Sequence, residues 1–230
     1  MTVSRPAGSS ERAVDMVFLD IGGVLYSDQR YRDSIRIAFR ELGADFADEE
    51  FDAEYTACRR DQTGSFRRRL TERFLGSSAR SAEVEAVASE HWRYRSGDLY
   101  PDVRPALDEL HGRYRLGILA NQPSAVRAAL ERDGIDRYFD VWGVSEDLGL
   151  SKPDPRLFRH ALEVAGSEPD RTVMVGDRLD YDMRPAKASG MRTVWVLRGE
   201  APDDPTPDQL REPDVAIRSL AELPAALERL

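Results

Sequence analysis

Three aspartates that follow short apolar runs are the residues best suited to chemistry. Asp20 ends the run VDMVFLD, and Asp177 follows the run TVMVG, with Asp182 five residues later. Short apolar runs that end in an acidic residue and a turn are typical of buried parallel strands, whose carboxyl ends meet at one edge of a sheet. Carboxylates gathered there repel one another unless a cation lies between them, and hard oxygen ligands suit Mg²⁺. One of them is also a candidate nucleophile toward phosphorus.

The elements that position these aspartates alternate between strand and helix. Strands are expected at 14–20, 115–120, 141–144, 172–176, 193–197 and 214–217. Helices are expected at 103–111, 123–133, 155–165, 181–189 and 221–230, and the Pro- and Asp-rich segment 200–213 is expected to be a surface loop. This alternation predicts an α/β fold, a Rossmann-like and mainly parallel sheet with helices on both faces.

A stretch without strand character interrupts the alternation after the first strand. Ile35, Ala38, Phe39 and Leu42 recur at helical spacing up to Gly43, and further helices are expected at 48–61, 65–75 and 81–95. We therefore predict a small all-helical cap domain over residues 28–96, inserted into a core formed by 13–27 and 97–230. Residues 1–12 are small and polar and are expected to be a disordered lead-in.

Composition narrows the class of protein and its partners. The 230 residues carry a net charge of −9, which argues against nucleic acid or an anionic membrane as the main partner. A single cysteine, Cys58, excludes an intramolecular disulfide and a cysteine-built metal site. The chain shows neither an N-terminal apolar signal nor a membrane-length apolar run, so we expect a cytoplasmic protein. Its oligomeric state, monomer or homodimer, stays open.

Four segments in order give the chain a family resemblance. They are the strand that ends in Asp20, the segment LGILANQ at 116–122, the segment SKPDP at 151–155, and GDRLDYD, which holds Asp177 and Asp182. Together they resemble the haloacid dehalogenase (HAD) superfamily of aspartate-nucleophile hydrolases. The helical insertion after the first segment is similar to the cap of that family's first structural class.

The resemblance implies a role for each matching residue. Asp20 would be the nucleophile and a Mg²⁺ ligand, and Gly22 would ligate through its backbone carbonyl. Asp177 would bind Mg²⁺ directly, and Asp182 would bind or orient the ion through water. Lys152 would pair with Asp20 and the transferred phosphoryl group, because a dianion approaching an anion needs cations to cancel the repulsion. The simpler alternative is that these carboxylates only cap helices.

Two positions depart from the family pattern. Its phosphatases usually have a second aspartate two residues after the nucleophile, which protonates the leaving alcohol, and here that residue is Gly22. Loss of a general acid typically costs ~10²–10⁴-fold where the leaving group needs a proton. The cap residue His91 is a possible substitute, although a packed helix face is the simpler role for it.

The second departure is Ala120, where a phosphate-binding Ser or Thr is usual in the family. Backbone N–H groups or the side chains of Asn121 and Gln122 are candidates to bind substrate in its place. Tyr26, Asp28 and Tyr31 follow the first motif where the chain enters the cap, and these positions also suit substrate contact.

Three functions are consistent with these residues. The favoured one is a Mg²⁺-dependent phosphatase of a small phosphorylated metabolite. A haloacid dehalogenase needs no leaving-group acid, but those relatives work without Mg²⁺, and the Asp177 and Asp182 pair speaks against it. A catalytically weak binding or scaffold protein is the third possibility, because fold alone does not determine function.

Overall fold

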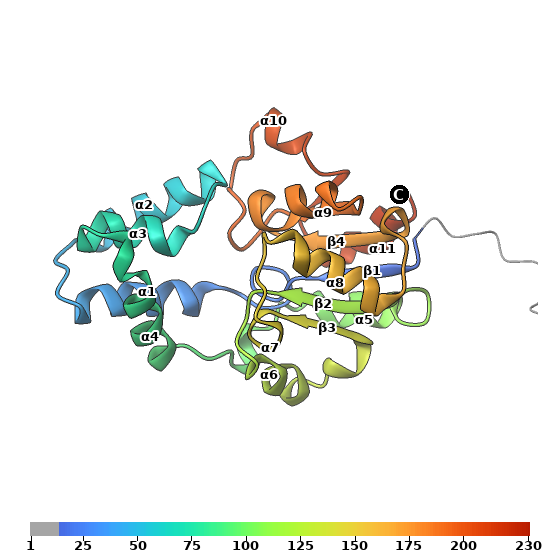
Figure 1. The fold of residues 1–230 in the computed structure, drawn as a ribbon, viewed down its shortest axis with the longest axis horizontal. Helices are drawn as coiled ribbons and strands as arrows, with labels where there is room; N and C mark the ends of the chain where they lie inside the picture. Colours follow the sequence, from blue (N-terminus) through green and yellow to red (C-terminus); the bar gives the residue numbers. More distant parts are fainter. Residues whose placement is uncertain (1–13) are drawn as a thin grey trace, which may run out of the picture.

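A parallel six-stranded sheet forms the centre of the protein, as a computed structural model of residues 14–230 shows (Figure 1). The strands are β1 (Met16–Leu19), β2 (Arg115–Ala120), β3 (Val141–Val144), β4 (Thr172–Gly176), β5 (Arg192–Val196) and β6 (Val215–Ile217). Their order is β3-β2-β1-β4-β5-β6 and every pairing is parallel. The strand order reverses direction between β1 and β4, which is the switch point where α/β sheets bind ligands. The predicted fold class is confirmed.

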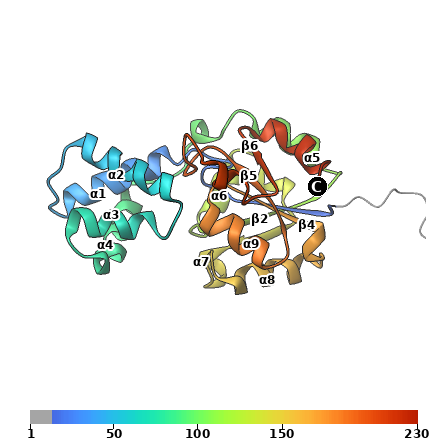
Figure 2. The same cartoon turned by 90° about the horizontal axis from the view of Figure 1, so that it is seen from above.

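Helices cover both faces of this sheet because successive strand residues point to opposite sides (Figures 1 and 2). Val17 and Leu19 of β1 belong to one apolar cluster, and Met16 and Phe18 belong to another. The first cluster includes α5 (Val103–Leu110), α6 (Val126–Arg132) and α11 (Leu223–Leu227). The second includes α8 (Pro155–Ala165) and α9 (Arg184–Ala188).

Short helical turns complete the core and differ in part from our expectations. The predicted helix 181–189 is a π-helical turn, η5 (Leu179–Met183), followed by α9, and the predicted loop 200–213 contains α10 (Pro207–Leu210). We did not predict α7 (Ser145–Leu148). Thr206 caps α10 by accepting a hydrogen bond from the backbone N–H of Gln209, with Pro207 in the first turn, so this start signal was present in the sequence. The remaining turns are η3 (Asp136–Tyr138), η4 (Pro169–Arg171) and η6 (Leu220–Glu222).

Four of the helices that lie between β1 and β2 in the sequence form a separate unit with an apolar core of its own. They are α1 (Gln29–Glu41), α2 (Asp48–Asp61), α3 (Phe66–Leu75) and α4 (Ser81–His91), with the turn η1 (Ser78–Arg80) before α4. Ile35, Phe39, Phe51 and Leu70 are among the residues that pack between them. We call α1–α4 the cap. The predicted domain limits at residues 28 and 96 stay a prediction.

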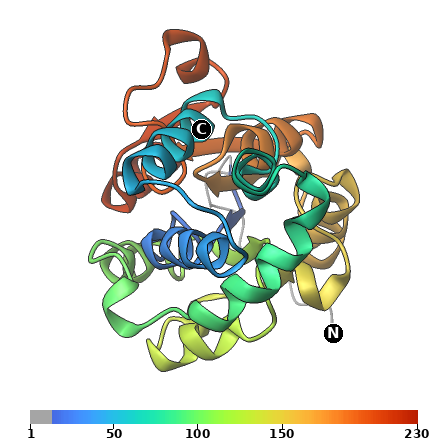
Figure 3. The ribbon, with the colours of Figure 1, turned by 90° about the vertical axis from the view of Figure 1, so that its left-hand side faces the viewer.

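Two short segments join the cap to the core and lie side by side. The outgoing segment at Tyr26 forms an antiparallel bridge with Leu99, which follows the turn η2 (Ser96–Asp98). Arg30 and Asp98 form an ion pair between the same segments, with a shortest N–O distance of 2.7 Å. Figure 3, seen from the cap side, shows the cap helices in front of the sheet edge where the strands end.

Two expectations from the sequence concern features beyond the sheet and the cap. None of the helices in residues 14–230 has both the length and the apolar character needed to cross a bilayer. The predicted disordered lead-in, residues 1–12, lies outside the residues that the structure describes.

Candidate active site

Asp20 lies at the carboxyl end of β1, where the ladder with β4 still holds its backbone. Its N–H donates to the carbonyl of Val175 at 2.9 Å, and its Oδ1 accepts from the N–H of Ile21 at 2.8 Å. The ammonium of Lys152 lies 2.9 Å from the other carboxylate oxygen, Oδ2. The carboxylate is therefore held by one backbone donor and one cation.

Asn121 holds Lys152 in place. The side-chain amide of Asn121 donates to the carbonyl of Lys152 at 2.9 Å, and its oxygen accepts from the N–H of Lys152 at 2.7 Å. Asn121 directly follows Ala120, the last residue of β2, so this clamp ties the lysine loop to the sheet edge. Both polar atoms of the side chain are used in this way, which makes Asn121 a support for Lys152 as well as a pocket residue.

Asp177 and Asp182 join Asp20 to form a three-carboxylate group. One carboxylate oxygen from each lies within 4.8 Å of the others. Oδ2 of Asp177 accepts from the N–H of Glu200 at 2.7 Å. Asp182 uses both oxygens, one toward Lys152 at 2.5 Å and one toward the N–H of Arg178 at 3.0 Å. Asp20 and Asp182 thus each engage both carboxylate oxygens, whereas Asp177 engages its Oδ2 with the N–H of Glu200.

The negative charges of the three carboxylates are only partly balanced by the ammonium of Lys152. Burial raises the pKa of Asp20 to about 6, and burial together with the neighbouring carboxylates raises the pKa of Asp177 well above its ordinary value. Burial alone would lower the pKa of Lys152, but the charges of Asp182 and Asp20 outweigh it and raise that pKa. Three carboxylates facing one ammonium are a hard-oxygen donor set, which fits a divalent cation such as Mg²⁺.

Two glycines leave room for the carboxylates of Asp177 and Asp182 to lie against the backbone. A Cβ on Gly23 would lie 2.0 Å from Oδ2 of Asp177, and the residue has a φ of +67°, which side-chain-bearing residues rarely adopt. A Cβ on Gly176 would lie 2.3 Å from Cγ of Asp182. Neither position accepts a side chain without displacing a carboxylate of the group.

Two of the three carboxylates, Asp20 and Asp177, line a cavity of about 1040 Å³ between the core and the cap, whereas Asp182 is fully buried behind them. Asp20, Asp28, Lys152 and Asp177 line it together with cap residues such as Tyr31. Other lining residues are Gly22, Arg67, Trp92, Tyr94 and Gln122. Two of these carry a buried polar atom with no partner among residues 14–230, Nε1 of Trp92 and Oε1 of Gln122. Such atoms are available to hydrogen-bond a bound molecule.

The structure separates the residues that we expected to contact substrate. Tyr31, Asn121 and Gln122 line the cavity. Tyr26 does not: it is fully buried in the core, and its hydroxyl donates to Asp133 at 2.8 Å, so substrate contact by this residue is not supported. His91 is exposed and its Nε2 lies 3.0 Å from Glu41, so it does not face the carboxylates either.

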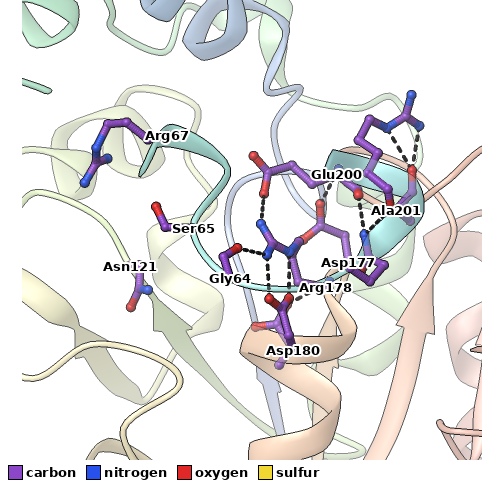
Figure 4. A network of polar contacts seen from close by, with 12 residues as sticks. Gly64, Ser65, Arg67, Asn121, Asp177, Arg178, Asp180, Glu200 and Ala201 are labelled. Atoms are coloured by element: carbon purple, nitrogen blue, oxygen red, sulfur yellow. Dashed lines mark hydrogen bonds and ion pairs between the residues drawn. The ribbon is translucent and has the colours of Figure 1, made fainter. Parts of the chain in front are cut away.

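Arg178 connects the cap to the site (Figure 4). Its guanidinium donates to the carbonyl of Gly64 at 2.8 Å and forms ion pairs of 2.8 Å with Asp180 and Glu200. The guanidinium also lies 3.7 Å above the ring of Phe66, at the start of α3. The loop between α2 and α3 is thereby held against the residue that follows Asp177.

Gln62 makes the same connection from the cap. It ends α2 in the left-handed conformation, and its buried side chain donates to the carbonyl of Glu200 at 2.7 Å while accepting from the N–H of Leu179 at 2.9 Å. Cap and core are therefore joined by hydrogen bonds beside the carboxylate group.

Comparison with known proteins decides the family. A family model described as a haloacid dehalogenase-like hydrolase matches residues 14–190. The chain belongs to the haloacid dehalogenase-like hydrolases. It is an enzyme of the HAD hydrolase family, as the four motif segments and the cap led us to expect.

Two curated relatives of this HAD-like hydrolase are named as phosphatases. The chain is 30% identical over 222 residues to the glyceraldehyde 3-phosphate phosphatase of Methanopyrus kandleri, covering 91% of this chain and 95% of that protein. It is 37% identical over 167 residues to the phosphoserine phosphatase of Thermus thermophilus, covering 70% of this chain and 64% of that protein. The crystal structure of a predicted phosphoglycolate phosphatase from Haemophilus somnus shares the fold, with a TM-score of 0.76 at 20% identity, covering 94% of this chain and 99% of that chain.

Sequence reasoning missed three residues of the HAD-like hydrolase that the structure places at the site. Arg178 directly follows Asp177, so its position in the motif was a usable signal. Tyr94 and Glu200 line the cavity from segments that we interpreted as a cap helix end and a surface loop. Nothing local in those segments indicates that they meet Asp20, because the contacts depend on how the cap and the β5 loop fold back.

Proposed function

We propose that the enzyme is a Mg²⁺-dependent phosphatase that hydrolyses a small phosphorylated metabolite through an aspartyl-phosphate on Asp20. The observation that carries this proposal is the placement of Asp20 against Lys152 and within the Asp177 and Asp182 group, on the wall of a cavity. The phosphatase activities of the named relatives support a phosphorylated substrate, and a cavity of about 1040 Å³ is ample for a small metabolite.

In the first step, an oxygen of Asp20 bonds to phosphorus while the bond from phosphorus to the leaving oxygen breaks. In the second, water attacks the same phosphorus and its bond to Asp20 breaks, releasing inorganic phosphate and restoring the carboxylate. Lys152 neutralises charge on the phosphoryl oxygens during both displacements. Asp20, Asp177 and the carbonyl of Gly22 would hold Mg²⁺, with Asp182 orienting it, and the ion supplies charge stabilisation at the phosphoryl group.

Gln122 and Tyr31 are the predicted substrate contacts that remain on the cavity wall, with Asn121 supporting Lys152. The hydroxyl of Tyr31 accepts from Arg67 at 3.0 Å, which places a cationic group of the cap on the same wall. Arg67 also forms an ion pair with Glu85, which lines the same cavity, so an anionic substrate would have to share this guanidinium with that carboxylate.

Asp20→Asn tests the proposal. The variant keeps the shape of the side chain but removes its nucleophilic oxygen anion, so hydrolysis of p-nitrophenyl phosphate with Mg²⁺ should fall to background while the circular dichroism spectrum is retained. Asp140→Asn, which makes the same chemical change at the exposed amino end of β3, is the matched control and should keep full activity. Acid-quenched wild type should carry phosphate on the peptide that contains Asp20.

Two further assays on the wild type separate the phosphatase from the alternative functions. A binding or scaffold protein would show no turnover in the wild type across a panel of phosphorylated metabolites. A dehalogenase would release halide from a 2-haloacid without Mg²⁺. Turnover by Asp20→Asn equal to that of the wild type would refute the aspartyl-phosphate mechanism.

A further inference from the structure

The carboxyl group of Asp28 occupies the space beside Gly22 that is left free by the missing side chain. Its Oδ1 lies 2.5 Å from the ideal Cβ position on Gly22, and its Oδ2 lies 3.1 Å from that on Gly23. Bond lengths of ~1.5 Å and ~1.2 Å at a trigonal carbon put an aspartate oxygen about 2.4 Å from its own Cβ. A carboxylate oxygen therefore stands at the reach that an aspartate at position 22 would have.

The ordinary structural role of an aspartate at this position is not fulfilled. Asp28 immediately precedes α1, where an aspartate normally accepts a hydrogen bond from an N–H of the first turn. Its side chain makes no such cap bond, and the hydroxyl of Ser27 accepts from the N–H of Gln29 at 3.3 Å instead. Nor does Asp28 belong to the three-carboxylate group identified among residues 14–230.

Asp28 shares the cavity with Asp20 and Tyr94. Tyr94 lines the same cavity, and its hydroxyl accepts from Nε2 of Gln122 at 3.3 Å. The ring of Tyr94 stacks on Tyr26, with centroids 4.6 Å apart. The carboxyl group of Asp28 therefore lies on the cavity wall, beside the nucleophile loop but on a different segment.

We propose that Asp28 is the general acid and base of the reaction, in place of a side chain at position 22. In the first step the O–H bond of its carboxyl breaks and the proton goes to the leaving oxygen, as that oxygen separates from the phosphorus bound by Asp20. In the second step the carboxylate takes the proton of the attacking water, as the bond from Asp20 to phosphorus breaks. This role rests on the proposed phosphatase function.

Other proton donors are less suited to this role. His91 is paired with Glu41 on the exposed side of α4. The hydroxyl of Tyr31 is engaged by Arg67 and faces Glu85 at 3.5 Å. Asp28 alone among these lies against Gly22.

The experiment compares leaving groups in Asp28→Asn. An alkyl phosphate such as glycerol phosphate releases a poor leaving group that needs a proton, whereas p-nitrophenolate leaves readily without one. We expect kcat/KM for the alkyl phosphate to fall by ~10²-fold or more, with a change of less than about tenfold for p-nitrophenyl phosphate. Asp33→Asn, one turn further along α1, is the matched control and should leave both substrates unaffected.

A second experiment moves the carboxyl group from position 28 to position 22. Asp28→Ala removes the oxygen that would collide with a side chain at position 22, and the φ of Gly22 lies outside the left-handed region, so aspartate is compatible with its backbone. The double variant Gly22→Asp, Asp28→Ala should regain at least about tenfold in alkyl phosphate hydrolysis over Asp28→Ala. Gly22→Asp alone should not improve on the wild type, because its side chain meets that of Asp28.

The outcomes are distinguishable. Equal losses on both substrates in Asp28→Asn, or no loss on either, would overturn the acid and base role while leaving the phosphatase proposal intact. Failure of the double variant to exceed Asp28→Ala, with both proteins folded by circular dichroism, would also count against it. If Asp20→Asn hydrolyses phosphate esters as fast as the wild type, both the proposed function and the role of Asp28 are overturned.

Discussion

The ammonium nitrogen of Lys152 lies 2.9 Å from Oδ2 of Asp20, and only 2% of the lysine side chain is exposed. The same nitrogen lies 2.5 Å from Oδ1 of Asp182, which is fully buried. One buried cation thus serves two carboxylates, and its position depends on the clamp from Asn121. Stability and catalysis should consequently depend on the same side chain.

Lys152→Met should reduce both the free energy of unfolding and kcat. Removing one partner of a buried ion pair typically costs about 3–5 kcal/mol in the free energy of unfolding, and loss of a positioned charge typically costs ~10²–10³-fold in kcat. Urea unfolding and kcat for p-nitrophenyl phosphate measure the two effects. Lys152→Met combined with Asp182→Asn should regain much of the stability, because one uncompensated carboxylate is gone, but no activity. Full activity in the single variant would refute a role for Lys152 in phosphoryl transfer.

Mg²⁺ should stabilise the folded enzyme in the absence of substrate. A ligand that binds only the native state raises stability by RT ln(1 + [L]/Kd), so millimolar Mg²⁺ should raise the Tm of the wild type. Asp177→Asn should abolish this shift because it removes one anionic ligand of the group. Asp45→Asn, an exposed change in the cap, should retain the shift. A wild type whose Tm is insensitive to Mg²⁺ would count against the metal site.

Arg178→Lys should weaken closure of the cap over the cavity. Lysine cannot reproduce the fork that joins Gly64, Asp180 and Glu200 or the stacking on Phe66. Destabilising the closed form by about 1.4 kcal/mol relative to the open form would raise KM roughly tenfold, with a smaller effect on kcat. Arg80→Lys, which changes a partly exposed arginine paired with Glu83, is the control. An unchanged KM with a lower kcat would place Arg178 in the chemical step instead.

Asp102 should make stability depend on acidic pH. It accepts from Arg198 at 2.8 Å, from the hydroxyl of Ser219 at 2.7 Å and from the N–H of Leu220 at 2.8 Å. Burial alone would raise the pKa of Asp102, but the hydrogen bond from Ser219 and the charge of Arg198 outweigh it and hold that pKa below its ordinary value. Asp102→Asn should thus lower the free energy of unfolding at pH 7 by about 1.5–3 kcal/mol.

The pH dependence follows from the direction of that shift. A carboxyl whose pKa is lower in the folded state contributes fully above its unfolded pKa of ~3.9, and the contribution is lost as the pH falls through the folded value. The difference between wild type and Asp102→Asn should therefore be constant from pH 7 to about 5 and shrink below about 4. Urea unfolding at several pH values measures it, with the exposed Asp170→Asn as control. A difference that grows toward acid would contradict the assignment.

Much of the fold could be predicted because local patterns in this chain agree with it. The expected helix 48–61 matches α2, and the expected strands 115–120, 141–144 and 172–176 match β2, β3 and β4. The errors fall where periodicity carries little information. Leu179–Met183 is a π-helical turn that has the same apolar spacing as a helix start, and Pro207–Leu210 is only one turn long.

The sequence by itself determined that Asp20, Asp177 and Asp182 meet, because parallel strands that end in acidic residues bring them to one edge. The tertiary structure decided what surrounds them. Tyr26 and Asp28 are two residues apart, yet one is buried in the core and the other faces the cavity. That choice depends on how the cap and the loop after β5 fold back past β1, which brings Tyr94 and Glu200 to the site from far along the chain. Such long-range contacts have no local sequence signal, since a residue's own neighbours do not encode which distant segment packs on it.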